Sequence, residues 1–200
     1  MTTIKHTSEA ERLAALEKYA ILDTDPELAF DDLTLLASFI CKTPIAMITL
    51  IDEHRQWFKS RIGISPSETS RDIAFCSAAI EQSDIFVVPD ALQDARFRDN
   101  PLVISEPHIR FYAGTPLITE EGYALGTLCV IDKKPRELLR EEREALRALS
   151  RLVLAQLEFR RNLKLLKEAL TDRTKGEHER QGELLKVQNT LMRVMGLRQH

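Results

Sequence analysis

The sequence predicts an α+β domain that is followed by a long C-terminal helix. Apolar residues recur at helical spacing near both ends of the chain, and apolar, strand-like segments fill its centre. A seven-residue apolar repeat begins at Leu149. The length of 200 residues suits one domain of about 150 residues and an extension.

Two helices are expected at the N-terminus, over residues 8–20 and 26–41. Ser8 and Glu11 have the spacing of a capping box, and Pro26 is placed to open the second helix at its first position. The apolar stripe of that helix is expected to face the core, and it consists of Leu28, Phe30, Leu33, Leu36, Ala37, Ile40 and Cys41.

The centre of the chain predicts an antiparallel sheet built from hairpins. Residues 45–51 are almost continuously apolar, which is typical of a strand buried on both faces. A polar turn leads to a second strand over residues 56–62. Residues 109–118 and 123–131 predict another hairpin.

The segments between these hairpins are shorter and less regular. Residues 63–72 are expected to form a loop, residues 73–82 a short helix and residues 85–88 a brief strand. Residues 90–108 are long for a plain connection, and such loops often carry function. A final long helix is expected to begin near residue 137, after Pro135.

Composition excludes several classes of protein. The formal net charge is −3, and no apolar run reaches the roughly 18 residues that a membrane-spanning helix needs. The N-terminus lacks the apolar segment of a signal peptide. We therefore expect a cytoplasmic protein that does not bind a membrane.

No motif indicates a metal site or a catalytic centre, so we expect neither a metal nor an enzyme. The five histidines are scattered, and Cys41, Cys76 and Cys129 lack the spacing of a zinc site, so reduced core thiols are expected. One alternative stays open. Cys76 lies at a predicted helix start, where a thiol can become more acidic, so a thiol-based redox sensor or reductase is a second hypothesis.

The C-terminal helix carries a seven-residue apolar repeat, which predicts a coiled coil between two copies of the chain. Two segments are expected, over residues 149–170 and 184–195, joined by a weak stretch that contains Gly176 and Gly182. Packing of this helix on its own domain is the alternative. The predicted dimer positions are Leu149, Leu152, Phe159, Leu163, Leu166, Leu170, Leu184, Val187 and Leu191.

The same C-terminal region is basic. Residues 160–200 contain 10 Lys and Arg against 5 Asp and Glu. Basic and acidic residues are interleaved, and no aromatic residue follows Phe159, so we expect a solvated helical face and no nucleic-acid binding.

Six motifs occur in order along the domain. They are Arg55–Gly63, Glu68–Ser77, Val87–Ala91, Asp94–Val103, Ile109–Leu117 and Leu125–Asp132. In this order they resemble the GAF domain, of the subtype found N-terminally in bacterial sensor histidine kinases and in diguanylate cyclases and phosphodiesterases. The resemblance covers residues 8–160 and leaves residues 161–200 as a coiled-coil signalling helix.

The resemblance implies a PAS-like antiparallel sheet with terminal helices on one face and a ligand cavity on the other. Residues 73–82 and 90–108 would roof that cavity. Taken one by one, the aromatic candidates are more typical of core residues than of a cavity lining. The residues that would line the cavity are Trp57, Phe75, Cys76, Asp90, Phe97, Phe111 and Thr115.

The resemblance also implies a function. It is a sensory module of bacterial signal transduction, as in two-component systems, which binds a small molecule or a partner and acts through a homodimeric coiled coil. An output domain after residue 200, or a separate kinase or cyclase, would receive the signal. Ala78 stands where relatives often carry a histidine, and the cyclic-nucleotide signature is missing, so neither ligand nor cofactor is named. A dimerisation module without a ligand is a further alternative.

Overall fold

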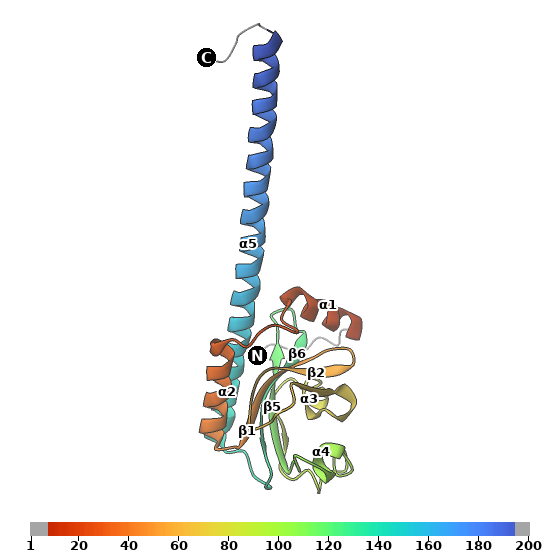
Figure 1. The fold of residues 1–200 in the computed structure, drawn as a ribbon. Helices are drawn as coiled ribbons and strands as arrows, with labels where there is room; N and C mark the ends of the chain where they lie inside the picture. Colours follow the sequence, from red (N-terminus) through yellow and green to blue (C-terminus); the bar gives the residue numbers. More distant parts are fainter. Residues whose placement is uncertain (1–7, 195–200) are drawn as a thin grey trace. The chain divides into compact units, whose positions relative to one another are not determined.

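The computed structural model describes residues 8–194. The chain divides after Phe159 into two compact units, and each is described by itself. The first unit holds a sheet with helices on both faces, and the second holds the C-terminal part of one long helix (Figure 1).

A six-stranded antiparallel sheet forms the centre of the first unit, in the order β3-β2-β1-β6-β5-β4. Both predicted hairpins are confirmed, and β1 is buried along its whole length. The strands are β1 Ile45–Ile51, β2 Arg55–Ile62, β3 Glu68–Ser70, β4 Phe86–Val88, β5 Phe111–Ile118 and β6 Ala124–Asp132. The short β3 lies where the sequence predicts only a loop.

The helices are α1 Glu9–Tyr19, α2 Leu28–Cys41, α3 Phe75–Ala79, α4 Pro101–Ile104 and α5 Arg140–Val194. A 3-10 turn, η1 Arg71–Ile73, precedes α3. The predicted capping box of α1 is present: the Ser8 hydroxyl accepts from the Glu11 amide at 3.3 Å, and the Glu11 carboxylate accepts from the Ser8 amide at 3.1 Å. The prediction that Pro26 opens α2 is wrong, because Glu27 is its N-cap.

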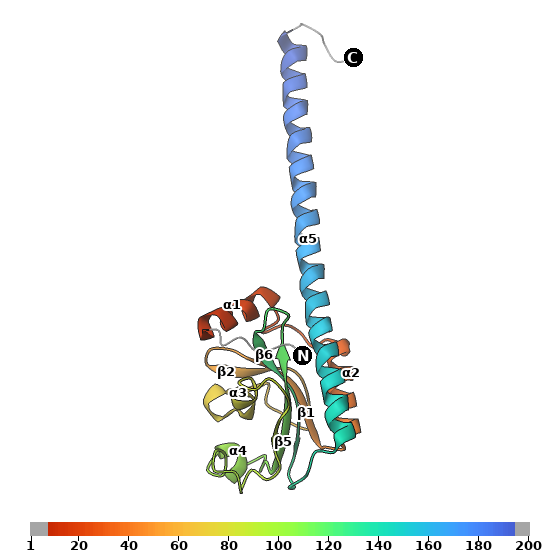
Figure 2. The same cartoon turned by 180° about the vertical axis from the view of Figure 1, so that it is seen from behind.

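Two apolar cores lie on opposite faces of this sheet, because successive strand residues point to opposite sides. The helix-side core includes residues of α1, α2 and the first turns of α5, and the hollow-side core includes residues of α3 and α4. The helices α2 and α5 lie on one side of the sheet, and α3 and α4 lie on the other (Figures 1 and 2). Ile48, Leu128 and Val130 belong to the first, and Met47, Cys129 and Ile131 belong to the second.

The predicted core stripe of α2 is only partly correct. Phe30, Ala37 and Cys41 are buried, whereas Leu28 is 81% exposed and Leu36 is 45% exposed. Residues 30, 34, 37 and 41 repeat at steps of three and four and so share one face of the helix. Leu28, Leu36 and Ile40 are the stripe members that lie outside this face.

The first turns of α5 pack on the sheet through Leu146, Leu149, Val153 and Leu157. Leu149 is therefore 6% exposed in the core of its own domain, which corrects its assignment to the dimer stripe. In the same turns Leu152 is 53% exposed and points away from this core.

The second unit contains the rest of α5, which is helical as far as Val194. The helix α5 is continuous through the weak stretch expected near residues 173–182, and the division into two coiled-coil segments stays a prediction. A glycine costs about 1 kcal/mol against alanine inside a helix, so Gly176 and Gly182 weaken this stretch without ending the helix. Residue 195 of the second predicted segment lies outside the described residues. Between residues 8 and 194, none of the helices has the length and apolar character that crossing a membrane requires.

Candidate functional site

The hollow-side core surrounds a small internal space, which we call the sheet hollow. It offers about 20 Å³ to the centre of a water molecule, close to what a single water needs. Strands of the sheet form its floor, and α3, α4 and the segment before β5 close it. Its lining residues are Met47, Gln56, Phe58, Ile64, Thr69, Phe75, Cys76, Leu102, Pro107, Ile109, Tyr112 and Ile131.

Two polar atoms in this lining are buried without a hydrogen-bond partner among the described residues. They are Gln56 Oε1 and Thr69 Oγ1, and the two residues are paired across β2 and β3. A buried polar group left without a partner costs about 1–3 kcal/mol. Because both oxygens can accept a hydrogen bond, this edge of the sheet hollow fits a molecule that offers an N–H or O–H group.

Stacked aromatic rings hold the roof of the sheet hollow. The rings of Phe75 and Phe97 lie 4.1 Å apart between centroids and 11° from parallel. The Arg96 guanidinium covers Phe97 at 5.3 Å and is held by Asp94, whose carboxylate it contacts at 2.5 Å. Asn100 joins the two roof segments by donating from Nδ2 to the Ile73 carbonyl at 3.0 Å. The roof is therefore an ordered layer built from two short helices.

Two cysteines and a tyrosine meet under this roof. Cys76 of α3 and Cys129 of β6 face each other with their Sγ atoms 3.8 Å apart. The Tyr112 hydroxyl donates to Cys76 Sγ at 3.2 Å. Thr49 and Thr127 lie beside them, with their hydroxyl oxygens 3.1 Å apart.

The surroundings of the two thiols give them different acidities. Burial opposes ionisation of Cys76, but hydrogen bonds from Cys129, Thr127, Thr49 and Tyr112 outweigh it and lower its pKa to about 7. The interaction with Cys76 and burial both raise the pKa of Cys129 well above the ordinary value. Cys76 is thus the thiol of the pair that ionises first.

The structure divides the predicted ligand-binding residues between the two cores. Phe75, Cys76 and Phe97 lie together in the hollow-side core. Trp57 and Phe111 belong to the helix-side core and do not reach the sheet hollow.

The remaining two candidates do not line the sheet hollow either. Thr115 alternates with Tyr112 and Gly114 along β5 and shares the face of Phe111. Its hydroxyl is buried and has no hydrogen-bond partner in the part of the chain that the structure describes. Asp90 accepts the Leu92 amide at 3.1 Å, which makes it a turn residue after β4. Ligand binding by these seven residues stays a prediction.

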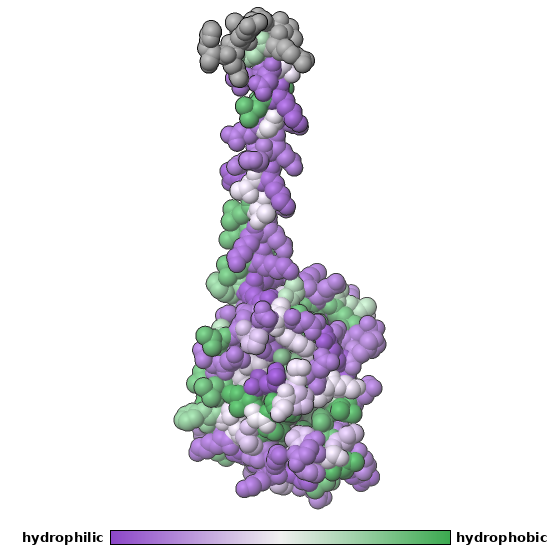
Figure 3. All heavy atoms as spheres, viewed as in Figure 1, coloured by the Kyte–Doolittle hydropathy of each residue, from purple (hydrophilic) through white to green (hydrophobic). Residues whose placement is uncertain are grey.

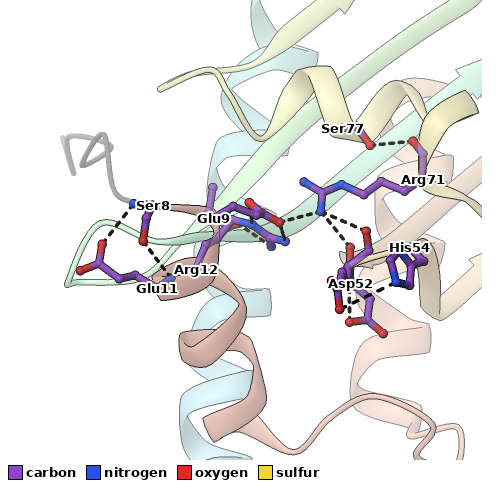
Figure 4. Close-up of polar contacts among 10 residues, drawn as sticks. Ser8, Glu9, Glu11, Arg12, Asp52, His54, Arg71 and Ser77 are labelled. Atoms are coloured by element: carbon purple, nitrogen blue, oxygen red, sulfur yellow. Dashed lines mark hydrogen bonds and ion pairs between the residues drawn. The ribbon is translucent and has the colours of Figure 1, made fainter.

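An arginine connects the roof to the N-terminal helix. Arg71 precedes α3, and its carbonyl accepts from the Ser77 hydroxyl at 3.0 Å. Its guanidinium donates to the Glu9 carboxylate of α1 at 2.6 Å and to the Asp52 carbonyl at 3.1 Å (Figure 4). Arg12 holds the same carboxylate with two hydrogen bonds of 2.7 and 2.8 Å.

The other end of α1 contacts α5. Tyr19, the last residue of α1, donates from its hydroxyl to the Glu158 carboxylate. Glu158 lies at the end of the part of α5 that packs on the sheet. Within the first unit, α1 therefore contacts the roof segment at one end and α5 at the other.

Four residues of this site are absent from the sequence prediction. Gln56 and Thr69 lie inside motifs that carry the resemblance, so the sequence gives their place in the domain. It does not show that their side chains point into the sheet hollow. Tyr112 and Cys129 alternate with residues of the opposite core along β5 and β6. That period-two pattern could have placed them on the hollow side.

Comparison with known proteins identifies the fold and its relatives. A profile of the GAF domain family matches residues 8–157. A cyclic di-GMP phosphodiesterase from Pseudomonas aeruginosa is 42% identical over 161 residues, which cover 80% of this chain and 27% of that protein. The chain thus spans about a quarter of the length of this curated relative.

Solved structures agree with this fold. A domain of a two-component sensor histidine kinase from Sinorhizobium meliloti has a TM-score of 0.56 at 15% identity, over 70% of this chain and 97% of that one. The free methionine-R-sulfoxide reductase from Neisseria meningitidis has a TM-score of 0.56 at 12% identity, over 82% and 99%.

These names correct the expectation that the chain is not an enzyme. One relative is named a phosphodiesterase, and a protein of the same fold is named a reductase. The lack of a recognised catalytic motif therefore does not set this sequence apart from enzymes. The profile match over residues 8–157 and the shared fold lead to one conclusion: the chain belongs to the GAF domain family, in the subtype that occurs in bacterial signalling proteins.

Proposed function

We propose that this chain is the sensory and regulatory module of a bacterial signalling protein, and that it works as a homodimer. A small molecule bound in the sheet hollow would shift the roof, and α5 of two copies would pair as a coiled coil. The observation that carries the proposal is the apolar stripe on α5, defined by Leu152, Phe159, Leu163, Leu166, Leu170, Leu184, Val187 and Leu191.

Every member of the α5 stripe is exposed, from 41% at Leu163 to 68% at Leu184. Hydrophobic side chains lie among hydrophilic ones along the visible side of this helix (Figure 3). The members alternate at steps of three and four residues over a seven-residue period, which is the pattern that a second helix of the same kind buries. A second copy of the chain carries the same stripe, so it is the occupant that we propose.

The size of the sheet hollow suggests how a ligand would act. Its room of about 20 Å³ admits nothing much larger than water. A larger molecule reaching Gln56 and Thr69 would have to displace α3 or α4. A ligand that binds more tightly when the roof is displaced would shift the protein toward that arrangement. The size of the shift is set by the difference in its affinity for the displaced and undisplaced roof.

A route for this change exists within the first unit. Movement of α3 would pull on Arg71, which holds Glu9 at the start of α1. The helix α1 would pass the movement to Tyr19 and hence to Glu158 of α5. A rigid helix linked at both ends couples two sites without a change in its own structure.

The domain that would receive the signal is proposed by analogy with the Pseudomonas aeruginosa relative. The phosphodiesterase is much longer than this chain, so the matching region there is one part of a larger protein. We propose that α5 leads to, or pairs with, a domain that makes or degrades a cyclic dinucleotide or that phosphorylates a partner.

The homodimer is tested by comparing two neighbouring leucines of α5. Leu166 belongs to the α5 stripe and is 56% exposed, whereas Leu165 lies beside it and is 55% exposed. Light scattering after gel filtration should give a dimer for the natural protein and for Leu165→Glu, and a monomer for Leu166→Glu. A monomeric natural protein at micromolar concentration, or equal masses of the two variants, would contradict the proposal.

A further inference from the structure

The sulfur pair under α3 has the features of a reversible disulfide site. Cys76 Sγ and Cys129 Sγ are 3.8 Å apart, so each must move by less than 1 Å or so to reach the roughly 2.05 Å of an S–S bond. Cys76 lies on a helix of five residues, Phe75–Ala79, and Cys129 lies on the central strand β6. The short helix is the partner that can adjust.

The two thiols are also unequal in a way that suits a redox reaction. The sulfur of Cys76 accepts a hydrogen bond from the Tyr112 hydroxyl and lies beside Thr49 and Thr127. The pKa of Cys76 is lowered to about 7 in spite of burial. The pKa of Cys129 is raised well above the ordinary value by Cys76 and by burial. A thiolate attacks an oxidant, and the neighbouring thiol then resolves the product.

Cys76 is also the more accessible of the two thiols. Cys76 lines the sheet hollow and Cys129 does not. A space with room for about one water-sized molecule admits a very small oxidant and excludes bulky ones.

From this geometry we infer that Cys76 and Cys129 form a peroxide-sensing disulfide that locks α3 to β6. The inference is independent of ligand binding and of the homodimer. It also extends the earlier hypothesis of a redox-active Cys76, because it names the second sulfur and the oxidant.

The chemistry balances with hydrogen peroxide as the oxidant. The Cys76 thiolate attacks one peroxide oxygen, the O–O bond breaks, and Cys76 sulfenic acid and one water result after proton uptake. Cys129 sulfur then attacks Cys76 sulfur, the S–O bond breaks, and a second water leaves with the Cys129 proton. Two thiols and one peroxide thus give one disulfide and two waters, and an added dithiol reverses the bond by exchange.

The oxidised bond would connect residues 53 positions apart in the sequence. It would hold the roof helix against the sheet and so keep the sheet hollow closed. Peroxide would then oppose the roof movement that a ligand needs.

The test needs no variant, because trypsin cleavage after Lys and Arg separates the cysteines. Cys41, Cys76 and Cys129 fall on residues 19–42, 72–96 and 111–133. After treatment of the full chain with hydrogen peroxide and acid quenching, mass spectrometry should find the second and third peptides linked. Dithiothreitol should restore the free thiols.

Matched variants assign the roles. Cys41 is buried in the helix-side core, and burial raises its pKa to about 12, so Cys41→Ser should leave the cross-link unchanged. Cys129→Ser should remove the cross-link and leave Cys76 sulfenic acid, which dimedone traps when it is added together with a denaturant that exposes the buried sulfur. Three unchanged thiols in the treated natural protein, a cross-link that involves Cys41, or links only between chains would each overturn the inference.

Discussion

Gly126 of β6 lies against the backbone of β1. A Cβ atom there would lie 1.9 Å from the Thr49 carbonyl oxygen, which belongs to the neighbouring central strand. Gly126→Ala should therefore force the two strands apart and lower the free energy of unfolding by about 3 kcal/mol, at the upper end of the cost of overpacking. Urea unfolding followed by Trp57 fluorescence measures this change.

Gly182 provides the matched control for that substitution. A Cβ atom at Gly182 meets nothing within 4 Å, and the residue lies inside α5. Gly182→Ala should leave the domain unchanged and add up to about 1 kcal/mol to helix stability. Equal stability of Gly126→Ala and the natural protein would mean that β1 and β6 have room that this structure lacks.

Gln56 is held in the sheet hollow at a cost to stability. Its Oε1 atom is buried without a partner among residues 8–194, and most of the side chains that line the sheet hollow are apolar. Gln56→Met has a similar volume and no polar group to desolvate, so it should raise the free energy of unfolding by about 1 kcal/mol. Gln82→Met, at an exposed position, is the control. A destabilised Gln56→Met protein would show that the amide is satisfied within the fold and is not kept for a ligand.

At the scale of elements, the sequence predicts the helices and strands whose apolar pattern extends over enough residues to show a period or a continuous apolar run. The strand β1 is predicted with its observed limits because seven successive apolar or small residues are buried on both faces. The strand β3 is missed because Glu68, Thr69 and Ser70 carry no pattern and become a strand only by pairing with the edge of β2. The four residues of α4 are too few for any helical period.

The candidate site is harder to predict because it depends on which face each strand residue takes. A bulge between Ile48 and Thr49 shifts the pairing of β1 with β2, and a shift by one residue exchanges the two faces of a strand. Trp57 was expected in the cavity and lies in the helix-side core. The meeting of Cys76 with Cys129 joins two elements 53 residues apart, which no local pattern reveals.

The attachment of α1 depends on pH because it centres on one carboxylate. Hydrogen bonds from Arg12 lower the pKa of Glu9 from 4.5 to about 2, against partial burial and with help from Arg71. A depressed carboxyl pKa stabilises the folded state above the unfolded value, and this contribution is lost as the pH falls from about 4.5 toward 2. Acid in that range should loosen the contact between α1 and Arg71 of η1.

The variant Glu9→Gln isolates this effect. It should be less stable than the natural protein at pH 7, and the difference should shrink steadily as the pH falls through the range between 4.5 and about 2. Glu11→Gln is a control within the same helix, since Glu11 caps α1 without touching Arg71. A stability difference between natural protein and Glu9→Gln that stays constant down to pH 2 would exclude Glu9 as the titrating group.

At the scale of the whole molecule, the two units obtain their stability in different ways. The first unit has two apolar cores, one on each face of its six-stranded sheet. In the second, the described side chains of α5 are almost all exposed, the apolar ones included. Most helical stability in proteins comes from the packing of an apolar face, so we expect this part of α5 to need a partner to stay fully helical.

Helix content should therefore depend on protein concentration. On dilution of the full chain from micromolar to nanomolar, the far-ultraviolet circular dichroism should lose helix as the dimer dissociates by mass action. The fluorescence of Trp57, which is 8% exposed in the helix-side core, should stay constant because the domain remains folded. Leu166→Glu should show the low helix content at every concentration, and Leu165→Glu should follow the natural protein. A helix signal that is independent of concentration in all three proteins would show that α5 is stable alone, and the need for a second copy would disappear.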